Sequence, residues 1–94
     1  MDHIRVIELL KKASKLTGIP ASEIHTGKST EAITFIRMVI AKVLRDDGMR
    51  VDVIAEAFNR STKSIYIWLG EMTPMGKNAS FFHEHLISDA PEIH

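Results

Sequence analysis

Cysteine is absent from the sequence, and so is any apolar run long enough to cross a membrane. Without cysteine, neither a disulfide framework nor a thiolate metal site can form. The opening MDHIRVIELLKK carries charges throughout and lacks the apolar core of a signal peptide. These absences predict a cytoplasmic protein with no membrane partner, and the chain of 94 residues suits one small hydrophobic core.

An excess of positive charge is also missing, which weighs against a nucleic-acid partner. Twelve Lys and Arg balance twelve Asp and Glu, so the formal net charge is zero. The distribution is uneven, because residues 1–69 hold eleven basic and eight acidic side chains, whereas residues 70–94 hold one basic and four acidic. A basic face can therefore exist on the body of the protein. The alternative is that these charges only solvate the surface.

The stretch IHTGKST, residues 24–30, looks like the end of a nucleotide-binding phosphate loop. That loop requires a glycine where this chain has Ser22, and a strand where PASEIH predicts a helical turn. No nucleotide partner is therefore expected. A helix that starts near residue 30 still offers unpaired backbone N–H groups. Lys28, Ser29 and Thr30 either hold a phosphate of another origin, or Ser29 or Thr30 only caps the helix.

Apolar residues recur at helical spacing along most of the chain. The longest such segment, STEAITFIRMVIAKVLRDDG, predicts a central helix capped by Ser29 or Thr30 and ended by Gly48. Before this segment we expect a helix at 3–16 ended by Gly18, and one helical turn that follows Pro20 and ends before His25. After it we expect two short helices around NRST and a last helix capped by Asn78 or Ser80. We therefore predict an all-α fold, a small helical bundle.

The segment VDVIAEAFNRSTKSIYIWLGEM predicts two short helices joined by a tight turn, the pattern of a helix-turn-helix. Other helical hairpins share this pattern, and the turn has Asn where glycine is usual. Tyr66 either faces outward or packs against the protein. Ser61 or Thr62 starts the second helix, whose core-facing residues are Ile65, Trp68 and Leu69.

The C-terminal part, residues 73–94, is expected to be an acidic extension with a short helix, next to a domain at 1–72. Pro74 and Gly76 break the chain before that helix. Its apolar side chains either cover the core or make a homodimer or partner contact: Phe81, Phe82, Leu86 and Ile87.

Taken together, the motifs between about residues 6 and 69 resemble the C-terminal DNA-binding domain, domain IV, of the bacterial replication initiator DnaA. The family has a turn and a Gly-Lys-Ser stretch where this chain has LTGIPASEIHTGKST. The long helix of the family carries two basic residues, and Arg37 and Arg45 have the same spacing here. In the family an Ala-Phe pair precedes the reading helix, and Ala57-Phe58 stands at that place in this chain. The resemblance implies a Trp-repressor-like helix-turn-helix fold in a bacterial or phage-encoded protein.

The same resemblance implies binding to double-stranded DNA, with Arg37 near the minor groove and the start of the reading helix in the major groove. The family's replication-origin preference is not expected, because the family opens this helix with Gly-Arg-Asp-His-Ser/Thr. The matching positions here are Arg60, Ser61, Thr62, Lys63 and Ser64.

We therefore expect a small DNA-binding regulator of transcription or replication. The protein is not expected to be an enzyme, because the sequence pairs no nucleophile with a base, and no cofactor is expected. The alternative is a protein-interaction or dimerisation module that kept the fold and lost DNA binding, as the neutral net charge and altered reading positions suggest. The candidate DNA-binding residues are Lys28, Ser29, Thr30, Arg37, Arg45, Arg50, Arg60, Ser61, Thr62, Lys63 and Ser64.

Overall fold

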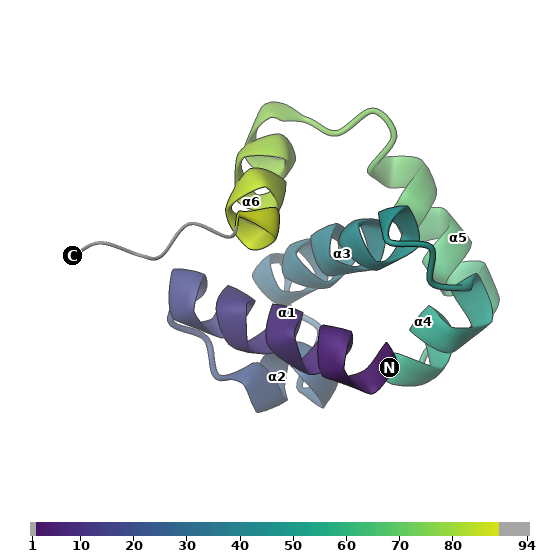
Figure 1. Ribbon diagram of the computed structural model, residues 1–94, viewed down its shortest axis with the longest axis horizontal. Coiled ribbons are helices and arrows are strands. Elements are labelled where there is room, and N and C mark those ends of the chain that lie inside the picture. The colour runs from purple at the N-terminus through teal and green to yellow at the C-terminus, as the bar shows by residue number, and fades with distance from the viewer. Residues whose placement is uncertain (1, 89–94) are drawn as a thin grey trace.

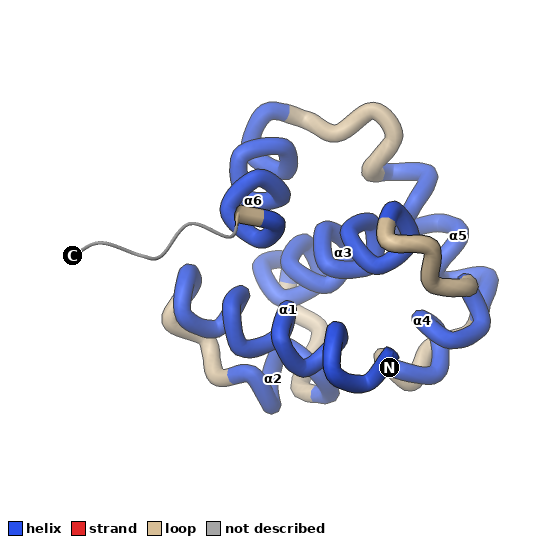
Figure 2. Tube along the Cα trace, in the orientation of Figure 1, coloured by secondary structure: helices blue, strands red, loops and turns tan. Residues whose placement is uncertain are grey.

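The computed structural model describes residues 2–88, and this part of the chain forms six helices and no strand (Figures 1 and 2). The helices are α1 (Asp2–Thr17), α2 (Ala21–Thr26), α3 (Glu31–Asp46), α4 (Val51–Ala57), α5 (Thr62–Glu71) and α6 (Lys77–Ile87). The all-α prediction is confirmed. Within the described part, no helix combines the length and the apolar character needed to span a bilayer.

Helix α3 is the centre of the bundle, and it contacts each of the other helices (Figure 1). Its buried side chains recur every three or four residues, which forms a broad apolar stripe that several helices cover together. Each aliphatic side chain buried in this way contributes about 1.5–3 kcal/mol. The main members of the stripe are at most 7% exposed: Ile33, Ile36, Val39, Ile40, Val43 and Leu44.

Local signals in the sequence set several helix ends. Gly18 (φ 79°) follows α1 and Gly48 (φ 95°) follows α3, both in the left-handed region that glycine adopts without steric cost. The Thr30 hydroxyl caps α3 by accepting an amide hydrogen bond of 3.1 Å, and the Ser61 hydroxyl caps α5 in the same way at 3.2 Å. Of the two caps that the sequence offered for α3, Ser29 and Thr30, the structure uses Thr30, while α5 starts at Thr62 directly after its cap Ser61.

Helix α2 is longer than the sequence predicts, since it continues through His25 to Thr26. The Gly27 amide donates a hydrogen bond to the Glu23 carbonyl and completes the last turn. The His25 ring reaches the end of α4, where its Nε2 lies 2.7 Å from the Ala57 carbonyl oxygen. Helices this short are marginal alone, so the contact with α4 helps to hold α2 in place.

Helix α6 starts at Lys77, and no side chain caps it. The predicted caps, Asn78 and Ser80, are wrong because both residues lie inside the helix. Gly76 occupies the cap position, and glycine has no side chain that could accept a hydrogen bond.

One side of α6 packs on α3 and belongs to the common core. Leu86 is 1% exposed, and the Phe82 ring centre lies 6.3 Å from that of Phe35 in α3. Phe81 (65% exposed) and Ile87 (46%) face solvent instead. The core therefore continues across residue 72, and the last part of the predicted acidic extension, residues 89–94, lies outside the described residues.

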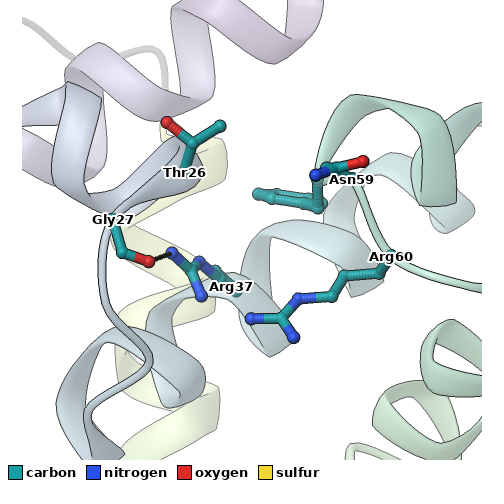
Figure 3. A pocket seen from close by; sticks show the side chains of 6 residues that line it. Thr26, Gly27, Arg37, Asn59 and Arg60 are labelled. Carbon is teal, nitrogen blue, oxygen red and sulfur yellow. Dashed lines mark hydrogen bonds between the residues drawn. The ribbon is translucent and has the colours of Figure 1, made fainter.

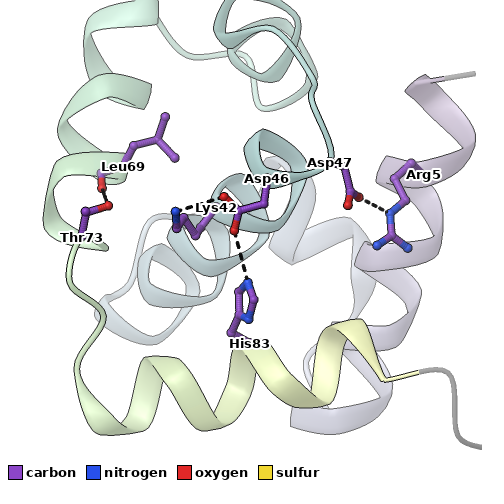
Figure 4. Close-up of polar contacts among 7 residues, drawn as sticks. All are labelled: Arg5, Lys42, Asp46, Asp47, Leu69, Thr73 and His83. Atoms are coloured by element: carbon purple, nitrogen blue, oxygen red, sulfur yellow. Dashed lines mark hydrogen bonds and ion pairs between the residues drawn. The ribbon is translucent and has the colours of Figure 1, made fainter.

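Polar contacts hold the end of α3 against α1 and α6 (Figure 4). Asp46 Oδ1 accepts from Lys42 Nζ at 3.0 Å, and His83 Nε2 of α6 lies 3.7 Å from Asp46 Oδ2. Asp47 Oδ2 accepts from Arg5 Nε of α1 at 2.7 Å. Carboxylates are unfavourable at the C-terminal end of a helix dipole, and these cationic or polar partners offset that cost.

Candidate nucleic-acid interface

The short turn between α4 and α5 fixes the start of α5. Asn59 has φ 54°, a left-handed conformation that Asn tolerates better than most residues, which explains how it replaces the usual glycine. The Arg60 amide donates to the Ala55 carbonyl at 2.8 Å. Phe58 is 3% exposed, and its ring meets the Trp68 ring edge-on with 5.8 Å between centres. The turn is therefore anchored in the core.

The outer side of α5 carries exposed polar residues beside one exposed apolar side chain, Ile67 (53% exposed). Ile65 (0% exposed) and Trp68 (8%) point into the core, as predicted. Tyr66 is 64% exposed, so of its two possible roles the structure selects the outward one. Thr62 and Lys63 are exposed as well, and Thr62 is the helix neighbour of Tyr66 four residues earlier. A hydroxyl, an ammonium group and a phenol thus lie together on the outer side of α5.

Ser61 and Ser64, two of the predicted reading residues, take part in the start of α5. Ser61 Oγ accepts from the Ser64 amide, and the two hydroxyl oxygens lie 3.1 Å apart. Hydroxyl oxygens have two acceptor sites and one donor, so these bonds occupy much of their capacity. The structure makes Ser61 the cap of α5 and places the Ser64 hydroxyl next to it, and a direct contact of either residue with a base stays a prediction.

A cavity of about 390 Å³, here called the Arg45 cavity, borders the exposed face of α5. Arg45 Nη1 donates to a backbone carbonyl at 3.2 Å, which steadies the side chain. Arg50 Nη2 pairs with Asp52 Oδ2 at 2.9 Å, and both residues are exposed. The structure therefore brings together several of the predicted residues, and the cavity is lined by Arg45, Arg50, Val51, Asp52, Thr62 and Tyr66.

Arg37 is only 1% exposed, and this corrects its expected position at the surface near a DNA minor groove. It points to the end of α2, where the carbonyls of the last turn can accept hydrogen bonds from outside the helix. Most of its N–H donors are used, and the charge is buried among polar acceptors. The acceptors are the carbonyl oxygens of Ile24 (2.6 Å from Nε), Glu23 (3.2 Å from Nη2) and Gly27 (2.7 Å from Nη2), and the Ser29 hydroxyl (3.0 Å from Nη1).

The glycine of the Gly-Lys-Ser stretch is explained by packing. A Cβ atom on Gly27 would lie 2.7 Å from both Cα and the carbonyl oxygen of Glu23, closer than real contacts allow. The φ of Gly27 is −76°, so the backbone conformation itself does not require glycine. Close approach of the chain to the end of α2 is therefore the reason for the residue.

The residues predicted at the start of α3 divide into different roles. The Thr30 hydroxyl caps the helix, and the Ser29 hydroxyl accepts hydrogen bonds from two arginines, Arg37 and Arg60. Lys28 is exposed and so is available to a ligand in solution. The capping interpretation holds for Thr30, while neither of the two sequence alternatives described the role of Ser29.

A second cavity, of about 180 Å³ and here called the Arg37 cavity, is lined by both Arg37 and Arg60. The Arg60 side chain extends toward Arg37, whose guanidinium group is directed at the Gly27 carbonyl (Figure 3). The pKa of Arg37 is lowered by burial and, as a smaller effect, by the positive charge of Arg60. Sequence reasoning identified both arginines but had no signal that would pair them. The other residues that line the cavity are Thr26, Gly27, Phe58 and Asn59.

Comparison of the chain with protein-family models, with curated proteins and with solved structures finds no match. The resemblance to DnaA domain IV therefore rests on the quoted sequence motifs.

Proposed function

We propose that the chain is a cytoplasmic regulator that binds double-stranded DNA, with α4 and α5 as a helix-turn-helix and the start of α5 in the major groove. The observation that supports this most is the exposed polar face of α5 between two arginine-lined cavities. Arg60 lines the Arg37 cavity, and Thr62 lines the Arg45 cavity. DNA binding requires this combination, because hydrogen-bonding side chains read base edges while basic side chains contact phosphates.

The side chains on this surface divide into two groups by their chemistry. Thr62, Lys63 and Tyr66 carry the polar tips that can approach base edges in the groove. Arg37 is 1% exposed, so it is not placed at a base edge; its hydrogen bond to the Gly27 carbonyl holds the loop that carries Lys28. The side chains that contact phosphates in this proposal are Lys28, Arg45, Arg50 and Arg60.

The resemblance to DnaA domain IV agrees with this proposal in the order of the elements and the place of the reading helix. It does not supply a target sequence, since Ser61, Thr62 and Lys63 replace the family's reading residues. We therefore expect measurable binding to unrelated duplexes before any preferred site is known.

The test is a fluorescence-anisotropy titration of a labelled random-sequence duplex, first at low salt and then at higher salt. With about four phosphate contacts, log K falls with log salt at a slope of about −3.6, so affinity drops roughly 100-fold between about 50 and 200 mM salt. Lys63→Ala weakens binding, whereas Lys11→Ala, an exposed lysine of α1 outside this surface, leaves it unchanged. Absence of binding at tens of micromolar protein in low salt would sink the proposal.

A second candidate, a dimerisation or protein-interaction module, is favoured by the outer side of α6. Phe81 is 65% exposed, and its ring lies against the His85 ring, tilted by 45° with 4.3 Å between centres, rather than in the core. Sedimentation velocity separates the candidates. A concentration-dependent dimer that Phe81→Ser abolishes, together with no DNA binding, supports the interaction module; a monomer at all concentrations excludes a homodimer through α6.

A further inference from the structure

The Arg37 cavity concentrates positive charge that no carboxylate neutralises within residues 2–88. Arg5, Lys42 and Arg50 each have an acidic partner within 4.0 Å, whereas neither Arg37 nor Arg60 has one in this part of the chain. The two guanidinium groups instead share one neutral oxygen, Ser29 Oγ. Two like charges beside a cavity repel each other, so an anion placed between them gains from both.

The two arginines are prepared to hold a ligand in different ways. Arg37 is fixed in place by its hydrogen bonds to backbone carbonyls, so its charge does not have to be ordered when a ligand arrives. Arg60 is exposed and belongs to the turn before α5, so it has N–H donors that a ligand can use. A rigid buried cation and an accessible one together make a directional site for an anion.

The size of the cavity limits what it can hold. At about 180 Å³ it is well below the volume of pockets that bind drug-sized ligands, which start at about 300 Å³. A single small anion or one phosphate group fits this limit, whereas a whole nucleotide does not.

The donors favour a phosphate over a carboxylate. Guanidinium groups bind both anions through paired N–H donors, but a carboxylate is planar and satisfies one fork. A phosphate has oxygens in several directions and can accept from Arg60 and from the one N–H of Arg37 that has no acceptor within residues 2–88; both arginines line the cavity.

We propose that the Arg37 cavity is a binding site for one phosphate-class oxyanion, held between Arg37 and Arg60. The anion is either a phosphate of a DNA backbone or a free phosphate group. This inference does not rest on the proposed function, because the cavity would bind inorganic phosphate whether or not the chain binds DNA.

The deciding experiment titrates inorganic phosphate into the ¹⁵N-labelled chain and follows the Nε–Hε signals of Arg37 and Arg60 by NMR. Sodium chloride at equal ionic strength is the reference. Both signals are expected to shift along one saturating curve with phosphate and to stay near their starting positions with chloride. In Arg60→Gln, the Arg37 signal reports phosphate affinity at least about tenfold weaker, since charge-assisted hydrogen bonds are lost.

The matched control is Lys11→Gln, which removes the same charge from an exposed lysine of α1 that lines neither cavity. It should bind phosphate as tightly as the unmodified chain. Shifts that do not saturate, shifts of equal size with chloride, or equal phosphate affinity in Arg60→Gln and Lys11→Gln would each overturn the proposal. Both variants alter exposed side chains, so both are expected to fold.

A DNA titration of the same proteins then identifies the source of the phosphate. If Arg60→Gln lowers the salt slope of DNA binding by about one, the anion is a backbone phosphate. If the slope is unchanged while phosphate binding is weakened, the site serves a free phosphate group. Saturable phosphate binding without any DNA binding would remove the proposed function and leave the anion site standing.

Discussion

The two arginine-lined cavities beside α5 contain the same kind of side chain in opposite environments. In the Arg45 cavity, of about 390 Å³, both arginines are exposed, and Arg50 pairs with Asp52. In the Arg37 cavity, of about 180 Å³, one arginine is buried, and the two guanidinium groups share the Ser29 hydroxyl. The exposed arginines of the Arg45 cavity can contact a partner in solution. The buried Arg37 instead holds the end of α2 in place.

The two cavities are expected to contribute differently to stability, because water reaches both arginines of the Arg45 cavity but hardly reaches Arg37. An exposed ion pair contributes about 0–1 kcal/mol because water screens it. A buried hydrogen-bonding group that loses its partner costs about 1–3 kcal/mol. The comparison therefore predicts that stability depends on the Arg37 cavity, while the Arg45 cavity matters mainly for binding.

The largest effect is expected from Arg37→Gln. The change removes the buried donors to three backbone carbonyls at the end of α2, and it should lower the free energy of unfolding by about 3–5 kcal/mol. Urea denaturation followed by circular dichroism measures it. Arg37→Lys keeps the charge but not the fork of donors, and should fall between Gln and the unmodified chain. A loss of less than about 1 kcal/mol in Arg37→Gln would contradict a structural role for Arg37.

Gly27→Ala tests the same junction through packing. The added methyl group would meet the backbone of Glu23 at 2.7 Å, and we expect a loss of about 1–3 kcal/mol in unfolding free energy. The control is Gly70→Ala in α5, where the new Cβ has no atom within 4 Å apart from its chain neighbours and the nearby backbone of its own helix. That helical change should stabilise the chain by up to about 1 kcal/mol. Equal effects of the two changes would show that the close approach at Gly27 is unimportant.

A smaller effect is expected at the turn that positions α5. Ser61→Ala removes the side-chain cap of the helix and should cost about 1 kcal/mol, seen as a lower midpoint of thermal unfolding. Thr62→Ala changes the next, exposed residue and should stay within about 0.5 kcal/mol. If the two variants unfold alike, the cap seen here does not contribute to stability.

The smallest effect on stability is expected in the Arg45 cavity. Arg50→Gln breaks the exposed pair with Asp52, and the unfolding free energy should change by no more than about 0.5 kcal/mol. If the chain binds DNA as proposed, the same variant lowers the salt slope of binding by about one. A large loss of stability in Arg50→Gln would contradict the prediction that only the Arg37 cavity contributes strongly to stability.

The parts of the fold that the sequence predicts correctly are those with a local physical signal. Gly18 and Gly48 end helices because the chain needs a left-handed residue there, and Thr30 and Ser61 cap helices through residues three positions later. The start of α6 was mispredicted because its cap position holds Gly76, while Asn78 resembles a cap without acting as one.

The candidate site was predictable where it depends on helical spacing. Thr62 and Lys63 lie outward because Ile65 and Trp68 of the same helix face inward, and this alternation is visible in the sequence. Arg37 was misplaced because the motif that it matches does not report burial. Its polar partners belong to α2 and to the loop that follows it, and the sequence pattern around Arg37 gives no sign of them.

The sequence by itself determined six helices, most of their ends, the central place of α3 and the outward face of α5, since periodicity and capping act over a few residues. Only the tertiary structure decided that Arg37 serves the end of α2 and that Arg60 meets it across a cavity. The bonds of Arg37 reach residues 8 to 14 positions away, and Arg60 reaches Ser29 across 31 positions. Contacts of that range exist only once α2, α3 and the turn before α5 have packed together, because packing places a buried donor against the acceptors that it needs.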